Sequence, residues 1–426
     1  METTETSLKN CLSQEAEYSD SFVGIHYQNG YFTINYPLGF TPIDLENNFS
    51  VENKNELEKQ YRKDILKLIS VLHYYKSKDR TKKESKEKFL RDDNKNFPLY
   101  SYIYIFNWYK KNGYYRPKEI QYKNGTKGKI NWNRTIKQIN PIVNNDNVVY
   151  LDFIVRKESY NEDELIAEIN RFCVYESFKK IGCLFTNKMP KKEKIKVRNK
   201  LYLNVLKKKI SSTFNDEERE LFINMKNILE SESNKNADKE YYYGTEYFNN
   251  IWESMIDDVY GIEKSSSEFL RPHVYWNIPG MKKKEFTLKP DTIMIPETDK
   301  TKNKIYILDA KYYKGGANLE DGSLPGGDSA IKQIVYAEKF RKNEKYKNYE
   351  IYNAFILPYD MQNTGLVSKL GETEEDWLKE EEKKSDCKYV KIQGIRMDTR
   401  SLLYKHQKAN EKIYDELAEI IEKDFS

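Results

Sequence analysis

Two aspartates and one lysine stand at the ends of two short apolar runs, and these residue types could do chemistry together. The runs are Thr292–Ile295 and Ile305–Leu308, and a polar turn rich in Lys, Asp and Asn separates them. This pattern predicts a β-hairpin or a pair of neighbouring strands. Asp291 opens the first run, and Asp309-Ala310-Lys311 closes the second. Neighbouring strands would bring both carboxylates and the ammonium group into one site.

Such a site suits the hydrolysis of a phosphodiester. Asp291 and Asp309 offer hard oxygen ligands, which select Mg²⁺, with Mn²⁺ as a substitute, over softer metals. A bound divalent ion neutralises the scissile phosphate, makes hydroxide from water and stabilises the leaving oxygen. Because side chains alternate along a strand, Lys311 leaves on the same side as Asp309, and Ala310 points the other way. We therefore expect Lys311 to hold the attacking water or to stabilise the pentavalent phosphate.

Weaker candidates surround this cluster. A DxK triplet at a strand end is often only a solvated turn, so the strand context carries the interpretation. Glu246 and Asp257 lie on turns of the helix expected at Thr245–Tyr260, ahead of the first strand. His273 could act as a general base, although metal and lysine chemistry does not call for one.

The elements around the cluster predict an α/β domain over residues 240–426. A helix is expected on each side of the two strands, because Thr245–Tyr260 has an apolar stripe and Asp328 or Ser329 can cap a helix to about Phe340. Two further strands and a closing helix are expected at Ile351–Leu357, Tyr389–Ile395 and Glu411–Ile421. This order indicates a mixed central sheet flanked by helices.

Residues 1–235 predict a separate α+β region of one or two subdomains. Its elements include a hairpin at Phe22–Tyr36, a helix from Asn53 to about Tyr75, a strand at Val148–Val155 and a helix at Asn161–Ile181. A basic helical segment covers residues 188–230, and Lys188–Lys209 holds ten basic residues against one acid. That segment suits phosphate contacts or is simply a solvated helix face. The polar stretch Ser231–Lys239 marks the expected boundary.

Composition bounds the class of protein. The chain has 426 residues and a net charge of only +5, so any nucleic-acid binding must come from local patches rather than from bulk charge. No apolar run approaches a membrane span and the N-terminus lacks a signal-peptide pattern, so we expect a cytoplasmic protein without membrane contact. The four cysteines are scattered without a CxxC pair, which is typical of a reducing compartment. No GxxxxGK[ST] motif occurs, so an NTPase would have to be a partner.

The residues around the cluster resemble known nucleases. Pro290-Asp291 followed by Asp309-Ala310-Lys311 is similar to the PD-(D/E)xK motif. The longer stretches LKPD, ILDAKYY and LPGGDSAIKQ resemble the LlaJI group of restriction endonucleases and, more distantly, McrC nuclease subunits. GKINWNRTI at Gly128–Ile136 is also similar to the LlaJI group, so the resemblance extends over about residues 95–426. Within it, Trp132 and Arg134 could stack on nucleic acid, although a Trp beside a turn is more often a packing anchor.

This resemblance implies a PD-(D/E)xK core in residues 240–426 and a Mg²⁺-dependent, type II-like restriction endodeoxyribonuclease. Its substrate would be unmodified double-stranded DNA, in a bacterial restriction-modification system that defends against phage and includes a companion DNA methyltransferase. The stretch FNNIWESM resembles the helix that supplies a further acidic metal ligand, which assigns that role to Glu253. By the same resemblance, Gln333 would lie beside the scissile phosphate.

Other assignments stay open at this point. The resemblance to McrC implies a nuclease subunit that depends on an AAA+ GTPase partner, with residues 1–235 docking on that partner instead of reading DNA. A non-specific repair or recombination nuclease, an RNA nuclease and a non-catalytic DNA-binding scaffold share the same core. One core cuts one strand, so double-strand cleavage would need a homodimer, a second endonuclease subunit or two successive events.

Overall fold

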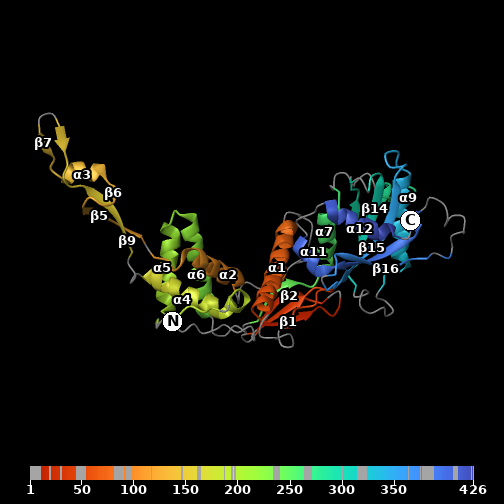
Figure 1. Ribbon diagram of the computed structural model, residues 1–426, viewed down its shortest axis with the longest axis horizontal. Helices are drawn as coiled ribbons and strands as arrows, with labels where there is room; N and C mark the ends of the chain where they lie inside the picture. Colours follow the sequence, from red (N-terminus) through yellow and green to blue (C-terminus); the bar gives the residue numbers. More distant parts are fainter. Residues whose placement is uncertain are drawn as a thin grey trace. The chain divides into compact units, whose positions relative to one another are not determined.

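The computed structural model describes most of the chain in two compact units (Figure 1). It describes residues 11–18, 21–28, 31–44, 54–80, 91–92, 98–116, 118–144, 147–160, 165–186, 188–192, 195, 198–233, 240–262, 271–296, 298, 301–313, 324–362, 364–374, 376, 388–405, 411–423 and 425. One unit holds residues 1–10 and 93–241, and the other holds residues 11–92 and 242–426.

A mixed five-stranded sheet forms the centre of the second unit. Its strand order is β13 (Thr292–Met294), β14 (Lys304–Ala310), β15 (Glu350–Tyr359), β17 (Ile392–Asp398) and β16 (Val367–Glu372). The three central strands are parallel and both edge strands are antiparallel to their neighbours. The central strands are apolar along almost their whole length, as expected for strands buried on both faces. The mixed α/β class predicted from the sequence is confirmed.

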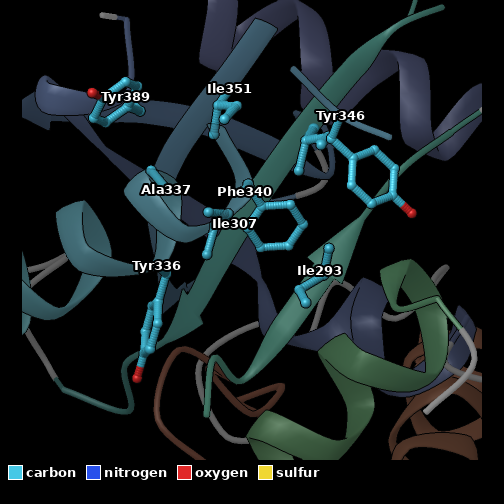
Figure 2. Packing of buried hydrophobic residues seen from close by; sticks show 9 residues of the cluster. Ile293, Ile307, Tyr336, Ala337, Phe340, Tyr346, Ile351 and Tyr389 are labelled. Atoms are coloured by element: carbon cyan, nitrogen blue, oxygen red, sulfur yellow. The ribbon is translucent and has the colours of Figure 1, made fainter. Parts of the chain in front are cut away.

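Helices cover both faces of this sheet. On one face, α9 (Gly327–Arg341) sets Ala337 and Phe340 against Ile307 and Ile351, and Figure 2 shows this packing. Tyr306 alternates with Ile307 along β14, so it faces the other side, where its hydroxyl bonds Glu422 of α12 (Glu411–Glu422). Two more helices contact this sheet. The helix α7 (Phe248–Tyr260) contacts β13 and β14, and α11 (Thr399–Lys405) contacts β17.

A second sheet belongs to the same unit. Its order is β1 (Cys11–Glu15), β3 (Tyr31–Tyr36), β2 (Val23–Gln28), β10 (Tyr241–Thr245) and β4 (Arg91–Asp92), and α1 (Lys54–Arg80) contacts β2. The antiparallel pairing of β2 with β3 confirms the hairpin predicted at Phe22–Tyr36. The helix predicted from Asn53 is confirmed as α1.

The division into residues 1–235 and 240–426 needs a correction, because residues 11–92 belong to the same unit as the central sheet. Buried hydrogen bonds hold them there: Leu38 N donates to the Tyr312 hydroxyl at 2.8 Å, and the Thr399 hydroxyl donates to Leu38 O at 2.8 Å. Gly39 has φ +70, and a Cβ there would lie 2.4 Å from Tyr359 N, so only glycine allows this approach. These are long-range contacts that a linear division of the chain does not reveal.

The other unit is built on α2 (Leu99–Asn112), α4 (Leu165–Ile181), α5 (Asn199–Ser212) and α6 (Asp216–Ser233), which pack on one another. Asn215 caps α6 by accepting from Glu218 N at 3.2 Å, and Cys173 and Cys183 are buried. Residues 161–164, the first part of the helix predicted at Asn161–Ile181, lie outside the described residues, and the rest of that helix is confirmed as α4.

This unit also holds short strands and one short helix. They are β5 (Lys118–Asn124), β6 (Lys129–Ile130), α3 (Trp132–Gln138), β7 (Ile142–Asn144), β8 (Asn147–Val149) and β9 (Ile154–Tyr160). The single strand predicted at Val148–Val155 is therefore wrong, since β8 pairs with β7 and β9 pairs with β5 and β6.

Two features complete the fold. In the second unit, β11 (His273–Trp276) and β12 (Lys284–Thr287) form a separate antiparallel ribbon between α7 and β13. Across the described parts of both units, every helix is too short or too polar to span a lipid bilayer.

Candidate active site

Asp291 and Asp309 lie side by side on neighbouring strands. The register of β13 on β14 pairs Thr292 with Leu308 and Ile293 with Ile307, and one further step sets Asp291 opposite Asp309. Both aspartates share the face of Ile293 and Ile307, the face covered by α9. Asp291 Oδ2 accepts a hydrogen bond from Ala310 N at 3.0 Å, which fixes the carboxylate against the end of β14.

Lys311 joins this pair. Its Nζ lies 2.9 Å from Asp309 Oδ2, and both side chains are largely buried. Lys311 N donates to Ile356 O at 2.9 Å, so the backbone keeps its strand direction for one residue beyond β14. The intervening Ala310 is buried. The structure therefore brings together the three residues that the sequence pattern selected.

The electrostatics of the pair are unfavourable without a cation. Burial, a hydrogen bond with Asp309 and the charges of Asp309 and Glu253 raise the pKa of Asp291 to about 9. Asp291 is therefore protonated at neutral pH, because its ionised form would be buried beside another carboxyl group. A divalent cation would replace that proton and remove the repulsion.

Glu253 lies close enough to sense this charge. It projects from α7, whose apolar face is buried and whose Trp252 Nε1 donates to Ile356 O at 3.4 Å. Burial raises the pKa of Glu253, the charge of Asp309 adds to that rise, and Lys311 opposes it. Glu253 and Lys311 line the same hollow of about 510 Å³.

The hollows at the site hold Glu246 and Asp257, which the sequence indicated as weaker candidates, together with residues that it did not indicate. The hollow shared by Glu253 and Lys311 is also lined by Glu246, Tyr247, Asn249, Ala310, Tyr312 and Tyr313. A smaller hollow holds Asp291 together with Asp257, Arg271 and Lys289. Lys289 could have been found, because it directly precedes Pro290-Asp291, whereas Arg271 is distant in sequence and carried no signal.

The donor set fits magnesium held by two carboxylates. Among the described residues, no group of three or more His, Cys, Asp and Glu side chains is arranged to hold a metal ion. Mg²⁺ is commonly bound through one or two carboxylates, with water and substrate phosphate completing its octahedron. The oxygen ligands of Asp291 and Asp309 match that demand, and Glu253 stands beside them without completing a protein cage.

Gln333 is buried on α9 but does not bond the cluster. Neither polar atom of its amide has a hydrogen-bond partner among the described residues. One turn along α9, the Tyr336 hydroxyl donates to Lys289 O at 3.0 Å. Burial and the charges of Asp291 and Asp309 raise the pKa of Tyr336 to about 12. Tyr336 is therefore the α9 residue that touches the edge of the site.

Three other candidates contact residues of neighbouring segments. Trp132 is 53% exposed and makes edge contacts with Tyr150 and Phe153, which agrees with a packing anchor. The Arg134 guanidinium lies 3.9 Å from the centre of the Tyr122 ring. His273 lies in β11, where it pairs with Glu285 of β12.

A comparison with protein families decides the affiliation. The model of the LlaJI restriction endonuclease family matches residues 48–392. The chain belongs to this family. In this LlaJI family member, the match spans both units and includes the candidate site residues Glu253, Asp291, Asp309, Lys311 and Gln333.

One relative of this LlaJI family member is component YdjA of the type II restriction enzyme BsuMI from Bacillus subtilis strain 168. The two are 27% identical over 282 residues, which is 62% of this chain and 59% of the relative. A chain in a structure of McrB AAA+ hexamers with bound McrC from Thermococcus gammatolerans is 14% identical, covering 92% of this chain and 82% of that chain. The TM-score of that match is 0.30, too low to show a shared overall fold.

Proposed function

We propose that this chain is a Mg²⁺-dependent, type II-like restriction endodeoxyribonuclease with a PD-(D/E)xK core in its central sheet. It would hydrolyse phosphodiester bonds of unmodified double-stranded DNA as part of a cytoplasmic restriction-modification system. The observation that carries this proposal is the placement of Asp291 and Asp309 side by side, with Lys311 2.9 Å from Asp309, at the edge of an open hollow. Membership of a family of restriction endonucleases supports it.

Asp291 and Asp309 would hold the metal ion. When bound, Mg²⁺ supplies Lewis acidity for the phosphate and lowers the pKa of a bound water. Asp291 would have to be deprotonated to hold a metal ion, and the hydrogen bond from Ala310 N would keep its carboxylate in place. We assign Glu253 as the third acidic residue, which accepts a hydrogen bond from water in the shared hollow.

Lys311 would act as a cation rather than as a base. Burial opposes its charge, but the hydrogen bond and charge of Asp309 outweigh burial, and the pKa of Lys311 is raised above its usual value. Its ammonium group therefore stays protonated at neutral pH. We infer that it neutralises charge developing on the phosphate and orients the attacking water.

Gln333 would contribute through its unpartnered amide. A buried amide without hydrogen bonds is costly, and such groups are often satisfied by a ligand. We propose that this amide reaches the scissile phosphate above Asp309 either after a small shift of α9 or through a bridging water.

A partner subunit is a second element of the proposal. The name of the relative from B. subtilis describes it as one component of a restriction enzyme. By analogy, we propose that this chain acts with at least one further protein, such as a second endonuclease subunit or a nucleotide-hydrolysing AAA+ protein, beside a companion methyltransferase. A second copy of the chain is the simplest way to cut both strands.

The test is cleavage of unmethylated phage DNA with Mg²⁺ by the native chain, by Asp309→Ala and by Lys311→Ala. Asp376→Ala and Lys339→Ala serve as matched controls, because they remove the same groups from exposed positions. We expect the native chain and controls to produce discrete fragments and both site variants to produce none.

The outcomes separate the alternatives. Fragments that appear only after addition of a partner with nucleotide would assign the chain to a motor-dependent enzyme. Random degradation would indicate a repair-type nuclease. Equal activity of Asp309→Ala and the native chain would contradict the site.

A further inference from the structure

The ribbon of β11 and β12 pairs with no other strand in the described part of its unit. All eight residues of its two strands are exposed. Val274 pairs with Phe286 and Trp276 with Lys284 across the strands, so an aromatic and apolar face is open to solvent. Trp276 is 60% exposed and Phe286 is 49% exposed. An isolated two-stranded ribbon is marginal in water, and exposed apolar patches of this kind commonly bind something.

The tip of the ribbon combines apolar and basic side chains. Gly280 has φ +79 and allows the turn in which Met281 N bonds Ile278 O. Met281 beyond it is 71% exposed. Lys282, Lys283 and Lys284 follow in sequence and all are exposed. Lys283 and Lys284 lie over the rings of Tyr275 and Phe286, at 3.8 and 5.3 Å from their centres.

The base of the ribbon is part of the active-site wall. Arg271 precedes the first strand and Lys289 follows the second, and both line the hollow that holds Asp291. Leu288 N donates to Pro272 O at 2.8 Å, which closes the base of the ribbon. Leu288 also packs against the core cluster under α9. The ribbon is thus anchored beside Asp291 at one end and exposed at the other.

We propose that this ribbon is a DNA-binding arm that enters a groove of the duplex and holds the scissile strand over Asp291 and Asp309. The proposal rests on the proposed function and extends it, because it assigns the residues that grip the substrate. Three successive lysines match the charge of phosphates on both sides of a groove. A two-stranded ribbon fits the major groove, and apolar side chains such as Met281 wedge against base steps. Aromatic faces such as Trp276 stack on exposed bases.

A protein partner would place other demands on this surface. An interface core is depleted in charged residues and Lys is disfavoured there, whereas here lysines lie over the aromatic rings themselves. The position of Arg271 and Lys289 beside the carboxylates also fits a polyanion that continues from the ribbon into the active site. These observations favour DNA over a protein as the occupant.

The test measures binding apart from cleavage. Fluorescent duplexes of unmethylated phage DNA are titrated with the full chain in a buffer that contains Ca²⁺. The binding constant is measured at several salt concentrations. The variant replaces Lys282, Lys283 and Lys284 by Ala. A matched control replaces Lys339, Lys342 and Lys347 by Ala. These exposed lysines lie at or beyond the C-terminal end of α9. Because Phe340 at that end packs with Ile305 and Ile351, the control positions lie away from Asp309. A triple Lys→Arg variant at 282–284 and Trp276→Ala complete the set.

We expect roughly tenfold weaker binding, or more, in the triple Ala variant of the ribbon. The slope of log K against log salt should fall by about 2.7, because each lost phosphate contact accounts for roughly 0.9. The triple Arg variant should restore both values, and the control should change neither. Trp276→Ala should weaken binding about tenfold without changing the slope. Thermal melting of the variants should match the native chain, since the ribbon tip is outside the core.

Several results would overturn the proposal. Unchanged affinity and slope in the triple Ala variant would do so, and cleavage by that variant at the native rate would show that the proposed function survives. Unchanged DNA binding with loss of a copurifying subunit would assign the ribbon to a protein interface instead. DNA binding that depends on the ribbon, without any cleavage, would keep the arm and contradict the nuclease. A native chain that neither binds nor cuts DNA would contradict both.

Discussion

The two ends of strand β14 hold their charged side chains in opposite ways. At the first end, Lys304 Nζ lies 2.7 Å from Glu422 Oε2, and the Tyr306 hydroxyl bonds the same carboxylate. At the other end, Asp309 and its neighbours Asp291 and Glu253 share the charge of Lys311. At the first end each charge is paired, whereas at the other end carboxyl groups crowd together and the pKa values of Asp291 and Glu253 are raised.

We interpret the first end of β14 as structural and the other end as the candidate functional site. The first end contributes stability, because each polar group has a partner. The other end raises the pKa of Asp291 to about 9, so ionisation of Asp291 destabilises the folded chain, and a bound cation would offset this cost. Groups held against their electrostatic preference gather at active sites, where binding of substrate or metal compensates them.

The largest expected difference between the two ends is in cleavage rate. Lys311→Ala should lower the rate by roughly 10²- to 10³-fold, because it removes a preorganised cation from the transition state. Lys304→Ala removes the same group from the first end and should leave the rate nearly unchanged. Single-turnover cleavage of unmethylated DNA measures the rate of both variants. Equal losses of rate would show that the two ends of β14 do not differ in this way.

The second difference is in stability, and it should fall on the first end. Glu422→Ala leaves Lys304 and Tyr306 without their shared acceptor and should reduce the free energy of unfolding by about 1–3 kcal/mol. Glu344→Ala is the control, because its pair with Lys347 is highly exposed and such pairs contribute about 0–1 kcal/mol. Urea unfolding followed by circular dichroism measures both. A loss no greater than the control would show that this end is not structural.

The third difference has the opposite sign. Asp291→Asn should stabilise the metal-free chain at pH 8 by about 1–2 kcal/mol, because it removes a carboxyl that ionises reluctantly in the folded state. The pKa of Asp291 rises from 3.8 to about 9 on folding, so ionisation favours the unfolded chain. The penalty is absent below pH 3.8, grows between these two values and is complete above the upper one. The advantage of Asp291→Asn should therefore shrink at pH 5.

Thermal melts in EDTA at both pH values check this prediction. Addition of Mg²⁺ should raise the melting temperature of the native chain more than that of Asp291→Asn. If Asp291→Asn were less stable than the native chain in EDTA at pH 8, the cost of ionising Asp291 would have to be compensated by other groups.

The smallest expected effect concerns Gln333. Gln333→Leu replaces an unpartnered buried amide by an apolar side chain of similar size, so stability should stay the same or rise by up to about 1 kcal/mol. Cleavage should nevertheless fall if the amide serves the phosphate. Parallel unfolding and cleavage measurements separate the two effects, and Gln333→Leu with native cleavage would remove Gln333 from the site.

Local pattern was sufficient to predict that Asp291, Asp309 and Lys311 lie together. Alternation along β14 predicts that Asp309 and Lys311 share one side, and the polar turn between two apolar runs predicts that Asp291 lies opposite Asp309. The apolar stripe of α7 and the start of α9 were equally visible, since both depend on residues within a few turns of each other.

Long-range contacts explain what the sequence did not reveal. Residues 11–92 join the central sheet through single polar contacts such as Leu38 with Tyr312 and Arg400 with Asp64, which no periodicity announces. The ribbon of β11 and β12 was missed because its strands do not alternate polar with buried residues. The burial of Gln333 without a partner also depends on tertiary packing.

We propose that Asp291 and Asp309, at the end of β14, bind a divalent cation. Titration of the metal-free chain with Mn²⁺, followed by electron paramagnetic resonance of the free ion, tests it most directly, with Asp309→Ala and Glu422→Ala as the variants. We predict saturable binding to the native chain and to Glu422→Ala, and loss of that binding in Asp309→Ala. Equal Mn²⁺ binding by Asp309→Ala and the native chain would show that these carboxylates do not hold the metal ion.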